Sequence, residues 1–310
     1  MLILKSISQP RIWGTERLKA YQATAPKTGS VYSVAGTTAI DCDTYNTKTQ
    51  QSMHLHDIVT QQPTMLGLKP GEPYPIIIDM LGADEHLSIQ VHPTDADARA
   101  QGLRYGKRES WYFITAPTSG KVFAGVKPAY RQGLSLTQIK QSPLAVVDQI
   151  SAKAGDCLYV PAGTLHAIQK GALVYEIQQS TDVTYRFFDY HRLGLDGRPR
   201  KLAVAAAYRN LVTSNAVTTI PLPLGGTTDQ RPYTLTHTRF IDTTWQNTGV
   251  IAAAITVLSG SLITASQMVL WPGQSVLALP GEIVRFKGAA TVMVAESHPY
   301  WRDESCAEKV

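Results

Sequence analysis

Four polar residues in three short stretches of this chain have the types and spacing of metal ligands. Gln90 and His92 lie two residues apart in LSIQVHP. Glu109 lies in GKRESWYF, and His166 lies in GDCLYVPAGTLHAI. Side chains at positions i and i+2 of a β-strand share a face, so Gln90 and His92 can approach one ion. The four residues form a mixed nitrogen and oxygen set, which suits Zn²⁺ and also Co²⁺, Mn²⁺ or Fe²⁺. Because the set contains no thiolate, we expect an open site that admits water or substrate.

The elements that must position these residues are mostly short β-strands. Apolar runs recur along the chain, several alternate with polar residues, and several end at Gly or Pro: YPIIIDML, ESWYFIT, KVFAGV, DCLYVP, ALVYEIQ, IAAAITVLSG, SLITASQMVL and EIVRF. This pattern is typical of a sandwich or barrel of antiparallel strands. Three segments predict helices: TDADARAQGL with Thr94 as its N-cap, SLTQIKQSPLAVVDQI interrupted by Pro143, and KLAVAAAYRNLV.

The strand pattern divides into two parts. Residues 213–232 are rich in Thr, Pro and Gly and poor in core residues, which predicts a connector. We therefore expect a mainly β protein with two β domains. Residues 1–212 carry the four candidate ligands and the helical additions, and residues 233–310 form a second domain without a metal. The second part repeats the Gly, apolar run and Pro-Gly in WPGQSVLALPGEIVRF, but Arg285 or a near neighbour lies where a histidine would fall.

The chain is basic, with a net charge of +5 over 310 residues. This charge fits either an ordinary solvated surface or attraction of an anionic ligand. Nucleic acid is not an expected partner, because the sequence has no long Lys/Arg run and no recognised binding motif. One basic cluster stands out in YRFFDYHRLGLDGRPRK, where a solvated loop is the first interpretation. Its cations are Arg186, Arg192, Arg198, Arg200 and Lys201.

The cysteines and the apolar segments favour a cytoplasmic location. Cys42, Cys157 and Cys306 lie far apart and form no Cys-x-x-Cys pair, which indicates reduced thiols. The first apolar segment, in MLILKSISQPRIWG, is too short for a signal peptide. The longest apolar run is far below a membrane-spanning length, so no membrane association is expected. The sequence predicts no particular oligomeric state.

The spacing before His166 resembles the second sequence motif of the cupin superfamily, whose members are small jelly-roll β-barrels. The motif consists of Gly155, five residues, Pro161, one residue, Gly163 and two residues before the histidine. We expect the Pro-x-Gly turn to reverse the chain, so that the returning strand points His166 inward. A barrel interior is otherwise packed with apolar side chains. This histidine must therefore be hydrogen-bonded or bind a metal. The resemblance implies two cupin-like jelly-roll barrels, with helical additions to the first.

Four motifs in order resemble the type I mannose-6-phosphate isomerases, in particular the short bacterial form: LSIQVHP, GKRESWY, GDCLYVPAGTLHAI and YEIQQSTDVTYRFFDY. PRIWGTERL near the N-terminus also fits, and the resemblance covers roughly residues 10–210. It implies an enzyme with one Zn²⁺ per chain that interconverts mannose 6-phosphate and fructose 6-phosphate through an enediol. By motif, the implied metal ligands are Gln90, His92, Glu109 and His166. The implied pocket residues are Ser88, Lys107, Glu176, Asp182 and Arg186.

The residue types at the implied pocket suit this chemistry. Moving a carbonyl from C1 to C2 develops negative charge on oxygen, which a divalent cation and an arginine both stabilise. We expect Arg186 to face the enediolate or the phosphate, and Lys107 and Ser88 to help bind the anion. Glu176 and Asp182 are candidates for proton transfer or for orienting other groups.

Two stretches depart from the family pattern. Asp79 in YPIIIDML stands where the family usually has a lysine. An anion there would repel a phosphate, unless Asp79 is turned away or paired with an arginine. The family pattern Gly-Glu-x-Trp is replaced in KTGSVYSVAG, which has Ser30 and Tyr32 at the altered positions. These departures leave three alternatives open: another sugar phosphate as substrate, a metal-binding cupin that senses or binds carbohydrate without catalysis, and a metal-dependent oxygenase on the same barrel.

Overall fold

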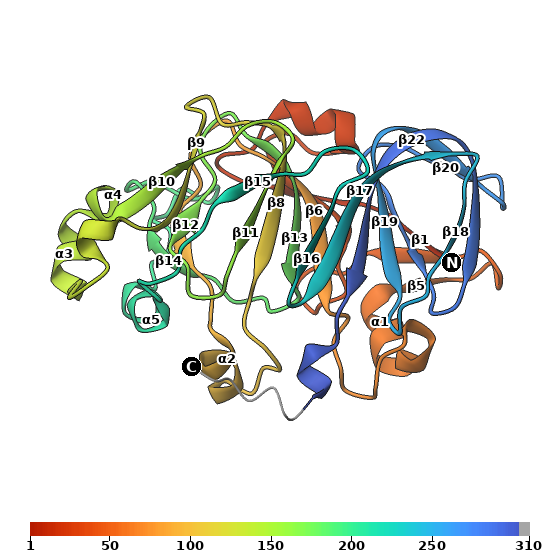
Figure 1. Cartoon of the computed structure of the whole chain (residues 1–310), viewed down its shortest axis with the longest axis horizontal. Helices are drawn as coiled ribbons and strands as arrows, with labels where there is room; N and C mark the ends of the chain where they lie inside the picture. Colours follow the sequence, from red (N-terminus) through yellow and green to blue (C-terminus); the bar gives the residue numbers. More distant parts are fainter. Residues whose placement is uncertain (304–310) are drawn as a thin grey trace.

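The computed structural model describes residues 1–303. Antiparallel strands dominate it and form three hydrogen-bonded sheets of seven, five and ten strands. In Figure 1 the seven- and five-stranded sheets occupy the left and centre, and the ten-stranded sheet occupies the right. The prediction of a mainly β, cupin-like fold is confirmed. None of the described helices is both long and apolar enough to span a membrane.

The seven-stranded sheet lies at the centre of the fold. In spatial order its strands are β15 (Thr219–Pro221), β11 (Asp156–Val160), β8 (Glu109–Thr115), β13 (Leu173–Gln179), β6 (Ile76–Gly82), β3 (Thr28–Val34) and β2 (Ile7–Pro10). The five-stranded sheet consists of β10 (Val147–Ser151), β9 (Lys121–Val126), β12 (His166–Ala167), β7 (Ile89–Val91) and β14 (Tyr185–Phe188).

The ten-stranded sheet is built mainly from the C-terminal part of the chain. Its main path runs through β16 (Thr227–Gln230), β17 (Tyr233–Ile241), β22 (Ile283–Ser297), β19 (Ala253–Thr264), β21 (Ser275–Ala278), β1 (Leu2–Leu4), β4 (Asp43–Asn46) and β5 (Ser52–His54). Two short strands lie off this path, β18 (Thr244–Gln246) beside β22 and β20 (Val269–Leu270) beside β19.

The helices are short, and two of the three predicted helical segments are confirmed. The other, SLTQIKQSPLAVVDQI, is helical only as far as Val146, because Val147–Ser151 form strand β10. Helix α2 (Asp95–Ala100) begins after Thr94, whose hydroxyl accepts from the Asp97 amide. Helix α3 (Leu136–Gln141) ends before Pro143, which starts α4 (Pro143–Val146) because proline fits only the first turn of a helix. The remaining α-helices are α5 (Val204–Asn210) in the third predicted segment and α1 (Leu55–Gln61). Short 3₁₀ helices cover Glu16–Tyr21, Pro63–Leu66, Pro128–Tyr130 and Tyr300–Arg302.

Both faces of the seven-stranded sheet are covered. One apolar cluster joins it to the five-stranded sheet through residues such as Phe113 and Phe123. Another joins it to the ten-stranded sheet through residues such as Tyr175 and Leu277. A third cluster, which includes Val292, lies on the opposite face of the ten-stranded sheet. Burial of so much apolar surface on both faces holds the central sheet rigid, which is what a precisely spaced site requires.

Successive side chains of a strand point to opposite faces of the sheet, and this alternation decides which side chains of β13 line a pocket. On β13, Tyr175 and Ile177 pack into the cluster shared with the ten-stranded sheet. Val174 faces the five-stranded sheet, and Glu176 and Gln178 share that face further along the strand. Glu176 and Gln178 line a pocket there. One face of β13 therefore changes from apolar to polar along its length, and the pocket forms at the polar end.

The turn before His166 crosses between sheets instead of reversing within one. Strand β11 ends at Val160 in the seven-stranded sheet, whereas β12 pairs with β7 and β9 of the five-stranded sheet. The returning strand thus belongs to the facing sheet, and His166 points inward and is buried, as expected. Gly163 has φ +79°, and a Cβ there would lie 2.7 Å from the Asn210 carbonyl oxygen and 2.6 Å from Val212. Only glycine fits this crossing without strain.

Replacing Gly163 by alanine should therefore destabilise the protein more than a positive φ alone explains. Gly155→Ala is a matched control, because Gly155 also has a positive φ of +86° but nothing lies within 4 Å of its added Cβ. We expect about 1–2 kcal/mol loss for the control, and a larger loss for Gly163→Ala, measured by denaturant unfolding. Equal losses would show that the contacts to Asn210 and Val212 relax freely.

Each sheet combines strands from distant parts of the chain, so the three sheets do not correspond to three consecutive segments. Strand β1 pairs with β21, so the first residues join the C-terminal sheet. Residues 213–232 contain β15, paired with β11, and β16, paired with β17. The expected connector thus adds one strand to each of two sheets. The boundaries at 212 and 233 stay a prediction.

The thiols fit the expectation of reduced cysteines as far as the structure describes them. Cys42 and Cys157 are buried and free, and burial raises the pKa of each thiol to about 12. Cys306 lies outside the described residues.

Candidate active site and metal centre

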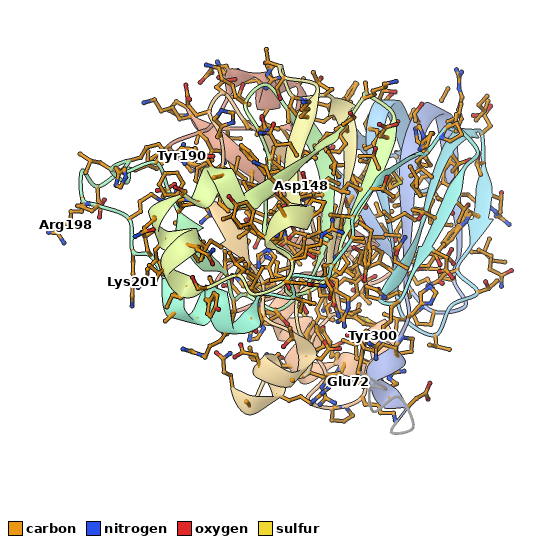
Figure 2. The ribbon with its side chains drawn as sticks, turned by 60° about the vertical axis from the view of Figure 1, so that its left-hand side comes forward. Glu72, Asp148, Tyr190, Arg198, Lys201 and Tyr300 are labelled. Carbon is orange, nitrogen blue, oxygen red and sulfur yellow. The ribbon has the colours of Figure 1, made fainter. Side chains whose placement is uncertain are left out.

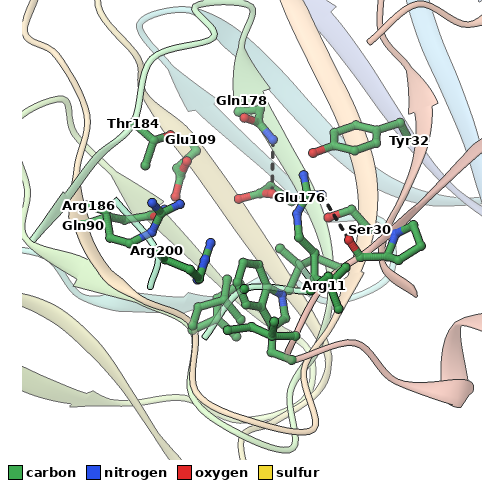
Figure 3. A pocket seen from close by; sticks show the side chains of 18 of the residues that line it. Arg11, Ser30, Tyr32, Gln90, Glu109, Glu176, Gln178, Thr184, Arg186 and Arg200 are labelled. Atoms are coloured by element: carbon green, nitrogen blue, oxygen red, sulfur yellow. Dashed lines mark hydrogen bonds between the residues drawn. The ribbon is translucent and has the colours of Figure 1, made fainter. Parts of the chain in front are cut away.

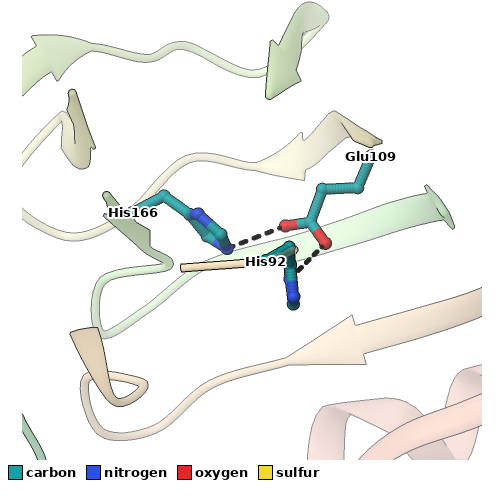
Figure 4. Close-up of side chains that lie close together, drawn as sticks. All are labelled: His92, Glu109 and His166. Carbon is teal, nitrogen blue, oxygen red and sulfur yellow. Dashed lines mark ion pairs between the residues drawn. The ribbon is translucent and has the colours of Figure 1, made fainter. Parts of the chain in front are cut away.

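Three of the four candidate ligands converge at one buried point. Nε2 of His92 lies 3.0 Å from Oε2 of Glu109, and Nε2 of His166 lies 3.2 Å from Oε1 of the same carboxylate. All three residues are 1–2 % exposed. Figure 4 shows the two imidazoles directed at the two carboxylate oxygens. His92 follows β7, Glu109 begins β8 and His166 begins β12, so both facing sheets contribute.

The hydrogen bonds of the two histidines show that a cation fits between these groups. Nδ1 of His92 lies 3.1 Å from the Val183 carbonyl oxygen, and Nδ1 of His166 lies 2.8 Å from the Thr164 carbonyl oxygen. A carbonyl only accepts, so each Nδ1 carries a proton and Nε2 is the ring atom that faces Glu109. Burial, followed by the charge of Lys107, lowers the pKa of His92 to about 4, which keeps it neutral.

Two kinds of acceptor therefore face each other in a buried space. Nε2 of His92 and Oε1 of Glu109 are both buried, and neither has a hydrogen-bond partner in the part of the chain that the structure describes. Buried acceptors at this spacing repel unless a cation lies among them. A second ring nitrogen that is fixed by a carbonyl is also the usual arrangement of metal-ligating histidines. Two imidazole nitrogens and a carboxylate are ligands that Zn²⁺ and related divalent ions accept.

Gln90 lies beside this group. Its Cα is opposite that of His166 in the β7–β12 pair, and its Nε2 lies 3.3 Å from Nε2 of His166. An amide coordinates a metal through its oxygen, and the amide nitrogen and oxygen exchange places by a rotation of the terminal torsion. Gln90 is therefore within reach as a fourth ligand after that rotation.

A pocket of about 460 Å³ opens over the metal-binding group. Its lining includes Gln90, Lys107, Glu109, Glu176 and Arg186 from the expected set. In Figure 3, Gln90, Glu109, Arg186 and Arg200 lie on one side, Ser30 and Tyr32 lie on the other, and Glu176 and Gln178 lie between them. The structure thus brings a candidate metal centre, a carboxyl group and several cations into one cavity.

A cluster of arginines forms one wall of this pocket. Arg186 and Arg200 both donate to the Ser88 hydroxyl, at 3.2 and 3.0 Å. Arg200 and Arg192 share the carboxylate of Asp189, at 3.0 and 2.6 Å. Burial lowers the pKa of both Arg186 and Arg200, and the neighbouring arginines lower it further. A single carboxylate does not neutralise these guanidinium groups, so an anion in the pocket would relieve their repulsion.

Lys107 and Glu176 line the same pocket. Lys107 is 8 % exposed, and its ammonium takes part in none of the ion pairs formed within residues 1–303. Glu176 accepts from the Trp111 indole at 2.7 Å and from the Gln178 amide at 3.1 Å. Burial, followed by the charge of Asp79, raises the pKa of Glu176 well above its ordinary value.

Ser88 and Asp182 lie outside the pocket wall. Ser88 is buried, donates to Asp189 at 2.7 Å and accepts from the two arginines, so its hydroxyl is already engaged. Asp182 is exposed and lines a smaller neighbouring cavity. The expected site is therefore brought together except for these two residues.

Several pocket residues were not singled out from the sequence. Arg11 lies in the quoted PRIWGTERL motif, and Arg200 lies in the basic cluster that was interpreted first as a solvated loop. That interpretation holds for Arg198 and Lys201, which are exposed and project outward in Figure 2. The guanidinium of Arg200 instead packs 4.8 Å from the Trp13 ring centroid. The neighbouring tryptophan in PRIWG was the available signal, because arginine stacks on aromatic rings.

Asp79 is fully buried and is paired with no arginine. Its Oδ1 accepts from the Gln178 amide at 3.3 Å, and its Cα is opposite that of Glu176 in the β6–β13 pair. The pocket-lining residues do not include it. Asp79 therefore lies behind the wall that Glu176 and Gln178 form, so a phosphate in the pocket would not touch it.

Curated relatives align with about two thirds of this chain. A probable mannose-6-phosphate isomerase of Bacillus subtilis is 31% identical over 214 residues, which are 66% of each protein. A mannose-6-phosphate isomerase of Streptococcus mutans is 31% identical over 215 residues, 66% of this chain and 65% of the relative. The matched part is thus slightly less than two thirds of either relative's length. No family model matches the chain.

Solved structures agree in fold over nearly the whole chain. The crystal structure of mannose 6-phosphate isomerase from Bacillus subtilis superposes with a TM-score of 0.81 at 24% identity, covering 95% of this chain and 99% of that one. A putative mannosephosphate isomerase from Archaeoglobus fulgidus gives 0.75 at 14% identity, covering 96% and 97%. At such identities these structures show the fold, while the curated relatives carry the family assignment. The chain belongs to the mannose-6-phosphate isomerase family.

Proposed function

We propose that this protein is a zinc-dependent aldose–ketose isomerase that interconverts mannose 6-phosphate and fructose 6-phosphate in the cytoplasm. The observation that carries the proposal is one pocket lined both by Glu109, which contacts His92 and His166, and by the arginine wall. A sugar phosphate has a carbonyl that a metal polarises and an anionic end that arginines bind. Either feature alone would fit many proteins, but the two together fit this substrate class.

His92, Glu109, His166 and, after its amide rotates, Gln90 would hold the metal. A bound divalent cation would polarise the sugar carbonyl and stabilise negative charge on its oxygen. Zn²⁺ is our proposal for the ion, and Co²⁺, Mn²⁺ and Fe²⁺ are compatible with the same ligands.

Side chains of the protein would bind the anion, position the arginines and transfer protons. Arg186 and Arg200 bind the phosphate or the developing oxyanion from one wall. Ser88, beneath them, holds both guanidinium groups in place instead of touching the substrate. Lys107 supplies a further positive charge, which acts on both His92 and Glu176. Glu176 is the favoured acid–base group over Asp182, because it lines the same pocket as Gln90 and Glu109.

A second candidate is an isomerase for a different sugar phosphate. Ser30, Tyr32 and Gln178 form the wall opposite the arginines, and Asp79 lies behind that wall. A changed wall at this place would alter contacts to sugar hydroxyls while leaving the metal and anion groups intact. This candidate shares the class of reaction and differs in the sugar.

A substrate panel tests the proposal. Fructose 6-phosphate formation from mannose 6-phosphate is followed in a coupled assay, with unphosphorylated mannose and other aldose 6-phosphates in parallel. We expect turnover of mannose 6-phosphate and a large loss with mannose, because the arginine wall then binds nothing. Turnover of another sugar phosphate alone would favour the second candidate. No turnover of any sugar phosphate by the metal-loaded protein would contradict both.

A further inference from the structure

A row of four side chains crosses the central sheet beneath the pocket. The strand registers place Tyr32 of β3 opposite Asp79 of β6, Asp79 opposite Glu176 of β13, and Glu176 opposite Trp111 of β8. Directly opposed residues of antiparallel strands share a face, with Cβ atoms about 4.5–5.5 Å apart. Two carboxyl groups therefore lie side by side, with an aromatic ring beyond each of them.

The two carboxyl groups are buried and are connected by shared donors. Asp79 is 0 % exposed and Glu176 is 7 % exposed. The Gln178 amide nitrogen lies 3.3 Å from Oδ1 of Asp79 and 3.1 Å from Oε2 of Glu176, so one NH₂ group bridges both. Oδ2 of Asp79 is buried and has no hydrogen-bond partner among residues 1–303. A proton between the two carboxyl groups would satisfy that oxygen and remove the repulsion of two buried anions.

We propose that Asp79 and Glu176 share one proton and act as a single acid, with Glu176 presenting the proton to the pocket and Asp79 holding it there. Asp79 is then a positioning residue, since it does not line the pocket. The catalytic part of this inference rests on the proposed isomerase function, whereas the sharing of the proton does not.

The charges around the pair agree with a single retained proton. Burial raises the pKa of both carboxyl groups, and the charge of Asp79 raises that of Glu176 further. Lys107 acts in the opposite direction on both, so one negative charge remains and faces one ammonium group. The titratable and charged groups that face the pair are Tyr32 of β3, Arg11 after β2, Lys107 before β8 and Glu109 at its start.

A pair that holds one proton suits an isomerisation, because each turnover takes one proton from the pair and returns one to it. The carbonyl oxygen O1 takes the proton from the pair as the C2–H electrons form the C1=C2 bond and the C2 proton leaves to a base. The O2 hydroxyl then returns a proton to the pair as C2=O2 forms, and C1 takes the proton back from the base. Atoms and charge balance, and no oxidant or reductant is needed.

Infrared difference spectroscopy tests the shared proton without using activity. At about pH 7.5 a solvated Asp or Glu is ionised, so a carboxylic-acid band reports a retained proton. We expect this band in the wild type, with metal bound and after chelation, and its loss in Glu176→Gln. Asp79→Asn should also lose it, because the new side-chain amide would donate to an ionised Glu176. Glu85→Gln is the control, since Glu85 is exposed, and should keep the band.

The absence of the band from the wild type would overturn the proposal, and so would its persistence in both Glu176→Gln and Asp79→Asn. Circular dichroism confirms folding, and Asp79→Ser replaces Asp79→Asn where the latter does not fold.

The pH dependence of kcat/KM tests the catalytic part of the proposal. In Asp79→Asn the basic limb of this profile should move to lower pH by at least about one unit, giving about tenfold lower kcat/KM on the basic side. An unchanged limb would show that Asp79 has no part in proton transfer. A wild type without turnover would contradict the proposed function and leave the infrared result to decide the pair.

The pH dependence of stability gives an independent readout of the same pair. A carboxyl whose folded-state pKa is raised contributes stability below its unfolded pKa, and that stability is lost as the pH rises through the folded pKa. The wild-type midpoint of thermal unfolding should therefore fall relative to that of Asp79→Asn between about pH 4 and pH 8. A constant difference across this range would mean that Asp79 is not held near a second carboxyl.

Discussion

Replacing His166 by alanine is expected to release the metal and abolish turnover in the same step. His166 supplies one of two ring nitrogens in the candidate metal group, and its Nδ1 is already fixed by the Thr164 carbonyl. The variant keeps a single histidine beside Glu109. We expect metal affinity to fall by more than the ~10–100-fold that follows loss of a residue hydrogen-bonded to a ligand. Turnover should fall by about 10³-fold or more, equivalent to about 4 kcal/mol of barrier.

The measurement is metal content per chain after dialysis, together with kcat/KM. His237→Ala is the matched control, since His237 is also buried and bonded through Nδ1 to a carbonyl, but lies on β17 in the C-terminal sheet. The control should keep its full metal content. A His166→Ala protein with an undiminished metal content would show that the ion lies elsewhere and would remove the basis of the site.

Replacing Arg186 by alanine is expected to leave the metal in place and lower turnover. Arg186 lines the pocket next to Gln90, and its guanidinium is held by Ser88 and by the Lys201 carbonyl. Arg186 is not one of the candidate metal ligands, so its replacement should not change the metal content. Loss of one group that stabilises developing charge typically costs about 10²–10³-fold in rate, and we expect a loss of that size in kcat/KM. Arg186→Lys should recover only part, because an ammonium does not reproduce the planar fork of a guanidinium.

Arg198→Ala controls for the loss of a positive charge from the same basic cluster. Arg198 is exposed and points away from the pocket. Its removal changes the net charge by the same amount as removal of Arg186, so it should leave kcat/KM within a small factor of the wild type. An Arg186→Ala protein with the activity of Arg198→Ala would exclude the arginine wall from catalysis.

The local elements of this fold could be predicted because each depends on a few neighbouring residues. The run ESWYFIT became strand β8 over the same residues, Glu109–Thr115. Thr94 caps α2, and Pro143 separates α3 from α4. In each case a period of two, a capping hydroxyl or a missing backbone donor acts within one turn or one strand.

Long-range pairing could not be predicted in the same way. Nothing in LIL at the N-terminus indicates that β1 will pair with β21, some 270 residues later. The Pro-x-Gly turn before His166 does not specify in sequence which sheet the returning strand joins, and β12 pairs in the five-stranded sheet instead of beside β11. Register and sheet assignment depend on partners distant in sequence, which local patterning does not specify.

The same distinction between local and long-range determinants applies to the site residues. The metal group was predictable because its members lie in compact motifs whose residue types already suggest coordination. Arg11 and Arg200 were not, since each reaches the pocket only through the folding of its own loop. Asp79 was recognised as a departure from the sequence alone, but its partner Glu176 became evident only from the β6–β13 register.

The central claim, that a metal held by His92, Glu109 and His166 drives isomerisation of a sugar phosphate, is tested most directly by removing and returning the metal. Purified protein of known metal content is assayed for fructose 6-phosphate formation from mannose 6-phosphate before chelation, after chelation, and after one equivalent of Zn²⁺ is returned. We expect turnover to be lost on chelation and to recover at one Zn²⁺ per chain. Turnover that persists in metal-free protein would contradict it.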